Sequence, residues 1–184
     1  QVLTSNPALF SLVYQSQEPG RGSETLCLHT TDIQLNRSSW LATVAYVYYE
    51  FDEGDKITIT GHVVASTLHD GKDSISDDTI RFYSGKDPST ELSSTRSQVI
   101  YNDIYCILMY SEMLGFQVWV RTIYLEEYNE VPYMCTLLYE ICSGDTKYFV
   151  YNVQNCYKVS NRKWPMIWHI KTKQHFNFFL SLQN

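Results

Sequence analysis

The chain has 184 residues, which suits one domain with a sizeable core and requires no second domain. Its formal net charge of −6 argues against nucleic acid as a partner, because nucleic-acid interfaces are basic. No apolar run approaches the roughly 20 residues of a membrane span, so we expect a soluble protein.

The charge is unevenly distributed along the chain. Residues 157–184 hold five Lys and Arg and no acid, whereas residues 1–156 hold nine bases against 20 acids. We therefore divide the chain into a body, 1–156, and a basic, aromatic C-terminal extension, 157–184.

Runs of β-branched and aromatic residues predict strands through the first half of the chain. The first is residues 8–14, which ends in a loop rich in Gly and Pro. A second strand around Cys27 and a hairpin follow. The expected strands after the first are 25–31, 39–51, 56–66 and 79–83, and residues 85–97 read as a charged connection.

The second half predicts a hairpin, a helix and a closing strand. Residues 99–110 and 116–124 flank a five-residue connection containing Gly115, which is typical of an antiparallel hairpin. Residues 131–142 keep helical spacing, with Pro near the start and Gly just past the end. Residues 147–153 read as a last strand.

The count is about eight strands in meander order with one short helix late in the chain. Such a pattern indicates an all-β fold, either a closed antiparallel barrel or a sandwich. The interior of an eight-stranded barrel can hold one small ligand. With aromatics at 15% of the chain, the side chains suit a lined cavity as well as a core.

The cysteines are the evidence for the compartment. The chain begins at Gln1, and we take any secretory leader to have been removed. The five cysteines form no C-x-x-C pair and no zinc pattern, so we expect disulfides and a secreted, extracellular protein. Asn36 begins an Asn-Arg-Ser acceptor sequence for N-glycosylation, consistent with secretion.

Nothing in the sequence favours an enzyme. We find no Ser/His/Asp constellation, nucleophile elbow or metal triad, and the five histidines are scattered among polar neighbours. His62 lies on an expected strand, where it faces the cavity or, more commonly, has a structural role. We therefore expect no catalytic residue, no metal and no cofactor.

The order and spacing of several motifs resemble the tick salivary lipocalins of the histamine-binding type. The resemblance runs from about Leu9 to Cys156. Its motifs are Tyr-Asn-Asp-x-x-Cys, an aromatic-x-x-Trp, Val-Pro-x-x-Cys and a final cysteine. The residues that carry them are Tyr101, Asn102, Asp103, Cys106, Phe116, Trp119, Val131, Pro132, Cys135 and Cys156.

This resemblance implies a secreted eight-stranded up-and-down lipocalin barrel that sequesters a small host mediator. It also implies two disulfides, Cys27 with Cys156 and Cys106 with Cys135. Cys142 is then unpaired, either as a buried thiol or as a link between chains, and the former is the simpler alternative.

The sequence departs from the histamine binders at their amine sites. Burying an ammonium group is costly unless a carboxylate meets it. The resemblance places Ile107 and Gln117 where those proteins have acids, and Arg21 where they have a tryptophan. Only Glu18, before Pro19, keeps the family's acid, so we expect at least one amine site to be absent.

The remaining candidate ligand-binding residues favour a lipid guest slightly over an amine. Gln117, Trp119 and Arg121 share one face of a strand, and the resemblance turns Trp119 inward. Arg121 can then hold a carboxylate or hydroxyl, or it lies at a solvated rim. An apolar wall completes the candidate set, with Ile80, Phe82, Tyr46 and Tyr48. Glu18 belongs to it if its carboxylate leaves solvent.

We therefore expect a monomer that binds an amine such as histamine, or a lipid such as a leukotriene, fatty acid or sterol. The alternative is an immunomodulatory protein that acts through its outer surface on a host receptor or complement component. The extension at 157–184 either packs on the barrel, which we favour, or forms an adhesive surface. In either case the barrel should fold without it.

Overall fold

The computed structural model describes residues 9–18, 25–36, 41–50, 56–66, 79–84, 94–152 and 156. The extension at 157–184, and the domain boundary drawn there, lie outside the described residues. Neither helix of the described part has the length and apolar character needed to cross a membrane.

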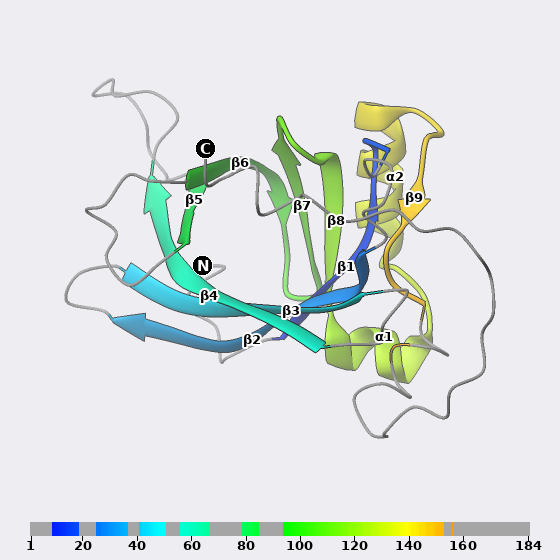
Figure 1. The fold of residues 1–184 in the computed structure, drawn as a ribbon. Helices are drawn as coiled ribbons and strands as arrows, with labels where there is room; N and C mark the ends of the chain where they lie inside the picture. The colour runs from blue at the N-terminus through cyan, green and yellow to red at the C-terminus, as the bar shows by residue number, and fades with distance from the viewer. Residues whose placement is uncertain are drawn as a thin grey trace.

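Nine strands and two helices follow one another in the described residues, and the strands form one antiparallel sheet that closes into a barrel (Figure 1). The strands are β1 Phe10–Gln15, β2 Thr25–Asn36, β3 Leu41–Glu50, β4 Lys56–Ser66, β5 Thr79–Ser84, β6 Ser94–Asn102, β7 Cys106–Ser111, β8 Gly115–Arg121 and β9 Tyr148–Phe149. The helices are α1 Thr122–Tyr128 and α2 Tyr133–Ser143.

Strand β1 closes the barrel. Each of β1 to β7 pairs with the next strand, and β1 also pairs with β8 through five residue pairs from Phe10↔Arg121 to Gln15↔Gln117. On its other edge β1 pairs with β2 at Ser11↔His29. There the Phe10 amide donates to the Thr30 hydroxyl at 2.9 Å, so a side chain extends the ladder. The predicted eight-stranded all-β barrel is confirmed.

The first strand is buried on both faces, which explains its continuous apolar sequence. Phe10 and Leu12 belong to the apolar cluster inside the barrel, whereas Val13 and Tyr14 pack in a second cluster that includes residues of α2. All six residues of β1 are buried.

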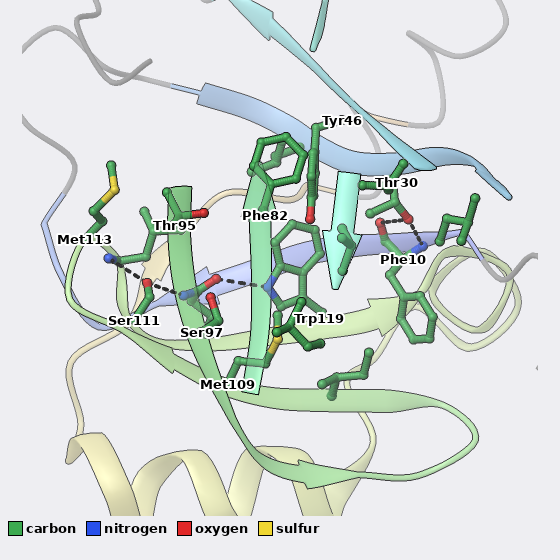
Figure 2. Close-up of a pocket in the computed structure, with 18 residues that line it drawn as sticks. Phe10, Thr30, Tyr46, Phe82, Thr95, Ser97, Met109, Ser111, Met113 and Trp119 are labelled. Carbon is green, nitrogen blue, oxygen red and sulfur yellow. Dashed lines mark hydrogen bonds between the residues drawn. The ribbon is translucent and has the colours of Figure 1, made fainter. Parts of the chain in front are cut away.

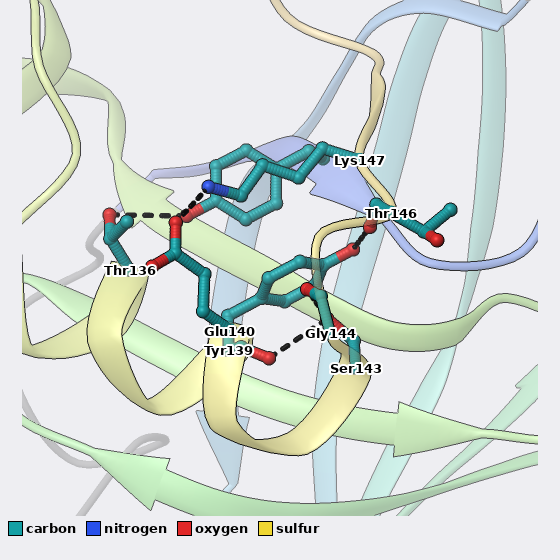
Figure 3. Close-up of polar contacts among 8 residues, drawn as sticks. Thr136, Tyr139, Glu140, Ser143, Gly144, Thr146 and Lys147 are labelled. Atoms are coloured by element: carbon teal, nitrogen blue, oxygen red, sulfur yellow. Dashed lines mark hydrogen bonds and ion pairs between the residues drawn. The ribbon is translucent and has the colours of Figure 1, made fainter.

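Helix α2 packs against the outside of the barrel along β7 and β8 (Figure 1). Its buried residues, Cys135 and Tyr139, face the barrel, and the Tyr139 ring meets the Tyr14 ring edge-on at 4.7 Å. Polar contacts fasten the helix at its ends (Figure 3). The Tyr14 hydroxyl lies 3.2 Å from the Thr136 hydroxyl, and the Tyr139 hydroxyl donates to the Thr146 carbonyl at 2.7 Å.

Two disulfides join the chain as the resemblance implies. Cys27 bonds to Cys156 across 129 residues, and Cys106 bonds to Cys135 across 29 residues, which attaches α2 to β7. Cys142 is free and exposed on α2, so the prediction of a buried thiol is wrong.

The prediction of one strand over residues 99–110 is wrong. The structure divides this run into the end of β6 and the beginning of β7, joined by a tight turn. The Asp103 carboxylate accepts hydrogen bonds from the backbone amides of Tyr105 and Cys106 at 2.7 and 2.8 Å, and so reverses the chain. Residues 94–97, predicted as part of a connection, begin β6.

The expectation of one helix is also wrong, because the strand predicted to reach residue 124 ends at Arg121 and α1 begins at Thr122. Leu125 is the buried residue of this short helix. The closing strand predicted over residues 147–153 shortens to β9, which pairs with β1 at Tyr14↔Phe149.

Removing the disulfides should lower stability, and the loss should be somewhat larger for the disulfide that closes the longer loop. In the chain-entropy model, Cys27→Ser/Cys156→Ser should lower the free energy of unfolding by about 5 kcal/mol and Cys106→Ser/Cys135→Ser by about 4 kcal/mol. Urea unfolding of the oxidised proteins measures both, with Cys142→Ser as the matched control. A large loss in that control would contradict the assignment of Cys142 as the free thiol.

Candidate functional site

A cavity lies inside the barrel between the two facing walls of strands (Figure 2). Its lining comes from β1 to β8 and from the hairpin connection between β7 and β8. The lining residues are Phe10, Leu28, Thr30, Ile33, Val44, Tyr46, Val63, Ile80, Phe82, Thr95, Ser97, Ile107, Met109, Ser111, Met113, Leu114, Gln117 and Trp119.

The cavity has room for one small guest. Its volume is about 140 Å³. Small-molecule sites usually occupy about 300 to 1,000 Å³, so this cavity suits a guest smaller than a typical drug-sized ligand.

Three aromatic rings from different strands meet in the cavity. Tyr46 on β3 lies between Phe82 on β5 and Trp119 on β8, with ring centroids 4.9 Å and 6.0 Å away (Figure 2). Both contacts are edge-to-face, the arrangement that aromatic quadrupoles favour. They give the cavity a rigid apolar wall.

Gly61 on β4 allows Phe82 its position in this wall. A Cβ atom added at Gly61 would lie 2.5 Å from the Phe82 ring and 2.3 Å from the Tyr83 carbonyl oxygen. Both distances are shorter than any real contact. The glycine therefore lets the ring lie against the backbone of β4.

A chain of buried hydrogen bonds supplies the polar part of the site. The Trp119 indole N–H donates to Gln117 Oε1 at 3.1 Å, and Gln117 Nε2 donates to Ser111 Oγ at 2.7 Å (Figure 2). Ser111 Oγ also accepts from the Leu114 amide at 3.2 Å. Because this oxygen already accepts two hydrogen bonds, the hydroxyl proton of Ser111 is available for an acceptor in the cavity.

The described lining contains no charged side chain. Asp, Glu, Lys, Arg and His are all absent from it, and its polar groups are hydroxyls, one amide and the indole. Tyr46 shows how apolar the interior is, because burial raises the pKa of its phenol to about 12. A charged guest would gain no opposite charge from these residues.

The structure brings together five of the eight residues predicted to bind ligand. Tyr46, Ile80, Phe82, Gln117 and Trp119 line the cavity. These five come from β3, β5 and β8, and their side chains share the inner face of the barrel as the period-two pattern predicts.

The other three do not line the cavity. Tyr48 follows Tyr46 by two residues on β3 and is buried in the apolar cluster with Phe10, Leu28 and Trp119. Arg121 is half-exposed at the end of β8, where the chain enters α1, and Glu18 is exposed. Neither charged group is placed to neutralise a guest in the cavity. Asn36, the predicted glycosylation acceptor, is exposed at the end of β2.

The sequence did not predict that β6 and β7 contribute residues to the cavity lining. Ile107, Met109 and Ser111 alternate along β7 and all line the cavity, so the period-two rule could have found them. The prediction of one strand over residues 99–110 places Ser111 in a connection, whereas the structure places it at the end of β7. His62, the histidine considered for the cavity, instead lies with Nδ1 3.5 Å from the Thr43 hydroxyl and is not part of the lining.

Three comparisons with known proteins bear on this architecture. A family model described as tick histamine binding protein matches residues 1–158. Among solved structures, the chain is similar to the crystal structure of AM182 in complex with serotonin, with a TM-score of 0.52 and 17% identity over 79% of this chain and 83% of that one. No curated protein matches the sequence.

The raised pKa of Tyr46 predicts a specific loss of stability in alkali. The pKa of the Tyr46 phenol is near 10 in the unfolded chain and about 12 in the barrel. The stabilising contribution of the neutral phenol is therefore complete below pH 10 and declines between pH 10 and 12. The decline should reach about 2 kcal/mol. Urea unfolding at several pH values measures it, and Tyr46→Phe should remove this part of the decline.

Tyr110→Phe is the matched control, since Tyr110 is exposed on β7. Equal pH profiles for wild type and Tyr46→Phe would contradict the assignment.

Proposed function

The chain belongs to the tick histamine-binding protein family, and from this membership and the cavity we propose that it is a secreted lipocalin that sequesters one small, mainly apolar mediator of the host. The observation that carries the proposal is a cavity inside the barrel with an aromatic wall, a short polar network and no charged side chain among its described lining residues. Capture of the mediator would blunt host inflammation or immunity. Two disulfides support an extracellular location.

The lining favours an uncharged guest over a bare ammonium ion. Moving an ammonium group from water into an apolar site is costly unless a carboxylate pairs with it. The positions at which the histamine binders carry acids hold Ile107 and Gln117 in this chain, and both line the cavity. These substitutions replace charge by apolar surface and by a neutral amide.

The same reasoning bears on the lipid class. Arg121, the residue considered as the partner of a carboxylate, is not in the lining. A hydroxyl or carbonyl head group is therefore favoured over a carboxylate. Its oxygen can accept hydrogen bonds from the Ser111 hydroxyl and from the second N–H of Gln117, and it needs no counter-charge. We propose a small alcohol or ketone lipid as the preferred guest. A sterol or eicosanoid is larger than the cavity and would have to extend through its open side.

An aromatic amine is the second candidate. The similar solved structure is a serotonin complex, and the family model is named for histamine binding. The ring faces of Tyr46, Phe82 and Trp119 offer cation–π contact to an ammonium group without any carboxylate. An immunomodulatory role of the outer surface is the remaining alternative from the sequence.

A ligand panel tests the order of preference. Isothermal titration against histamine, serotonin, a leukotriene and cholesterol should give the tightest binding with an uncharged lipid and a stoichiometry of one. Sub-micromolar affinity for histamine would contradict the argument from the missing acids. Absence of binding to every member, together with no lipid in an organic extract of the purified protein, would favour action through the outer surface.

Removing the polar network should weaken binding of the preferred guest without unfolding the barrel. Gln117→Leu keeps the side-chain volume but leaves the Trp119 indole N–H without its acceptor and removes one donor from the cavity. We expect affinity for a lipid alcohol to fall about tenfold to a hundredfold, equivalent to one or two buried hydrogen bonds. Gln34→Leu, at an exposed position of β2, is the matched control and should bind as wild type.

A further inference from the structure

Helix α2 is apolar on the side that faces away from the barrel. Its buried residues Cys135 and Tyr139 mark the inner side. The opposite side carries an outer apolar face, which we define as Tyr133, Met134, Leu137 and Ile141. These positions follow helical spacing, and the exposed fractions of Tyr133 and Ile141 are 76% and 70%.

Such a face needs an explanation, because a surface helix normally turns polar side chains toward solvent. Within the described part of the chain, the strands that contact α2 lie on its inner side, and Figure 1 shows the helix at the outside of the barrel. Contiguous exposed apolar surface on a soluble protein marks an interaction site.

Acidic residues surround the outer apolar face. Residues 122–146 contain five acids and no Lys, Arg or His. All five acids are exposed: Glu126, Glu127, Glu130, Glu140 and Asp145. Lys147, which follows this stretch, pairs with Glu140 (Figure 3). The surface therefore suits an occupant that is both apolar and basic.

We propose that the occupant is residues 157–184 of the same chain, which dock on the outer apolar face of α2. This segment holds five Lys and Arg, no acid, and two apolar runs at 164–170 and 176–180. Its charge is opposite in sign and equal in number to that of residues 122–146. The family model matches residues 1–158, so nearly all of the segment lies beyond the match.

The segment also starts in the right place. It follows Cys156, which is bonded to Cys27 and belongs to the same buried cluster as Cys135 and Tyr139 of α2. The segment therefore leaves the barrel from the same buried cluster on which α2 packs. Only residues 157–163 separate Cys156 from the first apolar run. A tether of this length gives the run an effective concentration of about millimolar, which favours docking within one chain over recruitment from solution.

The competing occupants fit the charges less well. A second copy of this chain in a two-fold contact would bring two outer apolar faces together, and with them two sets of the same acids. That repulsion opposes association. An anionic lipid surface would be repelled by the same carboxylates.

Cys142 provides a reporter for the test, because it is the free, exposed cysteine of α2 and the other four are paired. We suggest labelling Cys142 of the full-length protein with benzophenone maleimide, irradiating at low protein concentration, and mapping cross-linked tryptic peptides by mass spectrometry. Trypsin releases the two apolar runs on peptides 164–171 and 174–184. The expected result is a cross-link to one or both within a species of monomer mass.

Ile141→Glu should reduce the yield of this cross-link about tenfold, because a buried apolar contact becomes a charge among acids. Ile100→Glu, at an exposed position of β6, is the matched control and should leave the yield unchanged. High salt should reduce the wild-type yield by screening the charge pairs.

Cross-links in a species of dimer mass would replace the proposal with a contact between copies. Cross-links confined to barrel peptides, or a yield that Ile141→Glu leaves unchanged, would overturn it. Ligand titration of the labelled protein reads the cavity separately, so failure of the docking proposal and failure of the proposed ligand binding give different signatures.

Discussion

Closure of the sheet by β1 is the constraint on which the rest of the structure depends. One edge of β1 pairs with β8 and the other with β2, where the Thr30 hydroxyl takes the place of a backbone partner for Phe10. Because closure removes the free edges of the sheet, each strand gains an inner face and an outer face. The inner faces then line a cavity, and the outer face of the β1–β8 wall is available for α2.

The distribution of charge follows from this division. The chain is acidic overall, yet the described cavity lining carries no formal charge. The acids of the α1–α2 region are on the outside, where water solvates them, and the polar groups of the described cavity lining are neutral. A site of this kind selects by shape and by a few hydrogen bonds, and the long-range field of the protein contributes little to the orientation of the guest inside it.

Much of the fold could be predicted from the sequence because most strands are long and their side chains alternate between two environments. The hairpin at Gly115 and the helix over residues 131–142 follow local rules of spacing and turn chemistry. The turn at Asp103 is not predicted, because β-branched and aromatic residues continue on both sides of it. A turn made by the hydrogen bonds of one carboxylate has no signal in the composition. Helix α1 begins at a residue that suits a strand equally well.

The site was predictable in direction but not in depth. Period-two alternation correctly turned Gln117 and Trp119 toward one face, yet Arg121 on the same face lies beyond the end of the cavity. Tyr48 shares the inward direction of Tyr46 but is buried below the lining. Period-two alternation predicts which face of a strand a side chain lies on. Whether that side chain lines the cavity depends on how side chains from several strands fill the barrel.

The long disulfide has a topological consequence. Cys27 and Cys156 enclose β3 to β8, both helices and β9 within one covalent ring. If a protease cuts any one connection between these elements, the two fragments remain joined through sulfur, and the hydrogen-bonded sheet can hold its shape. The barrel would thus tolerate a single nick in this part of the chain.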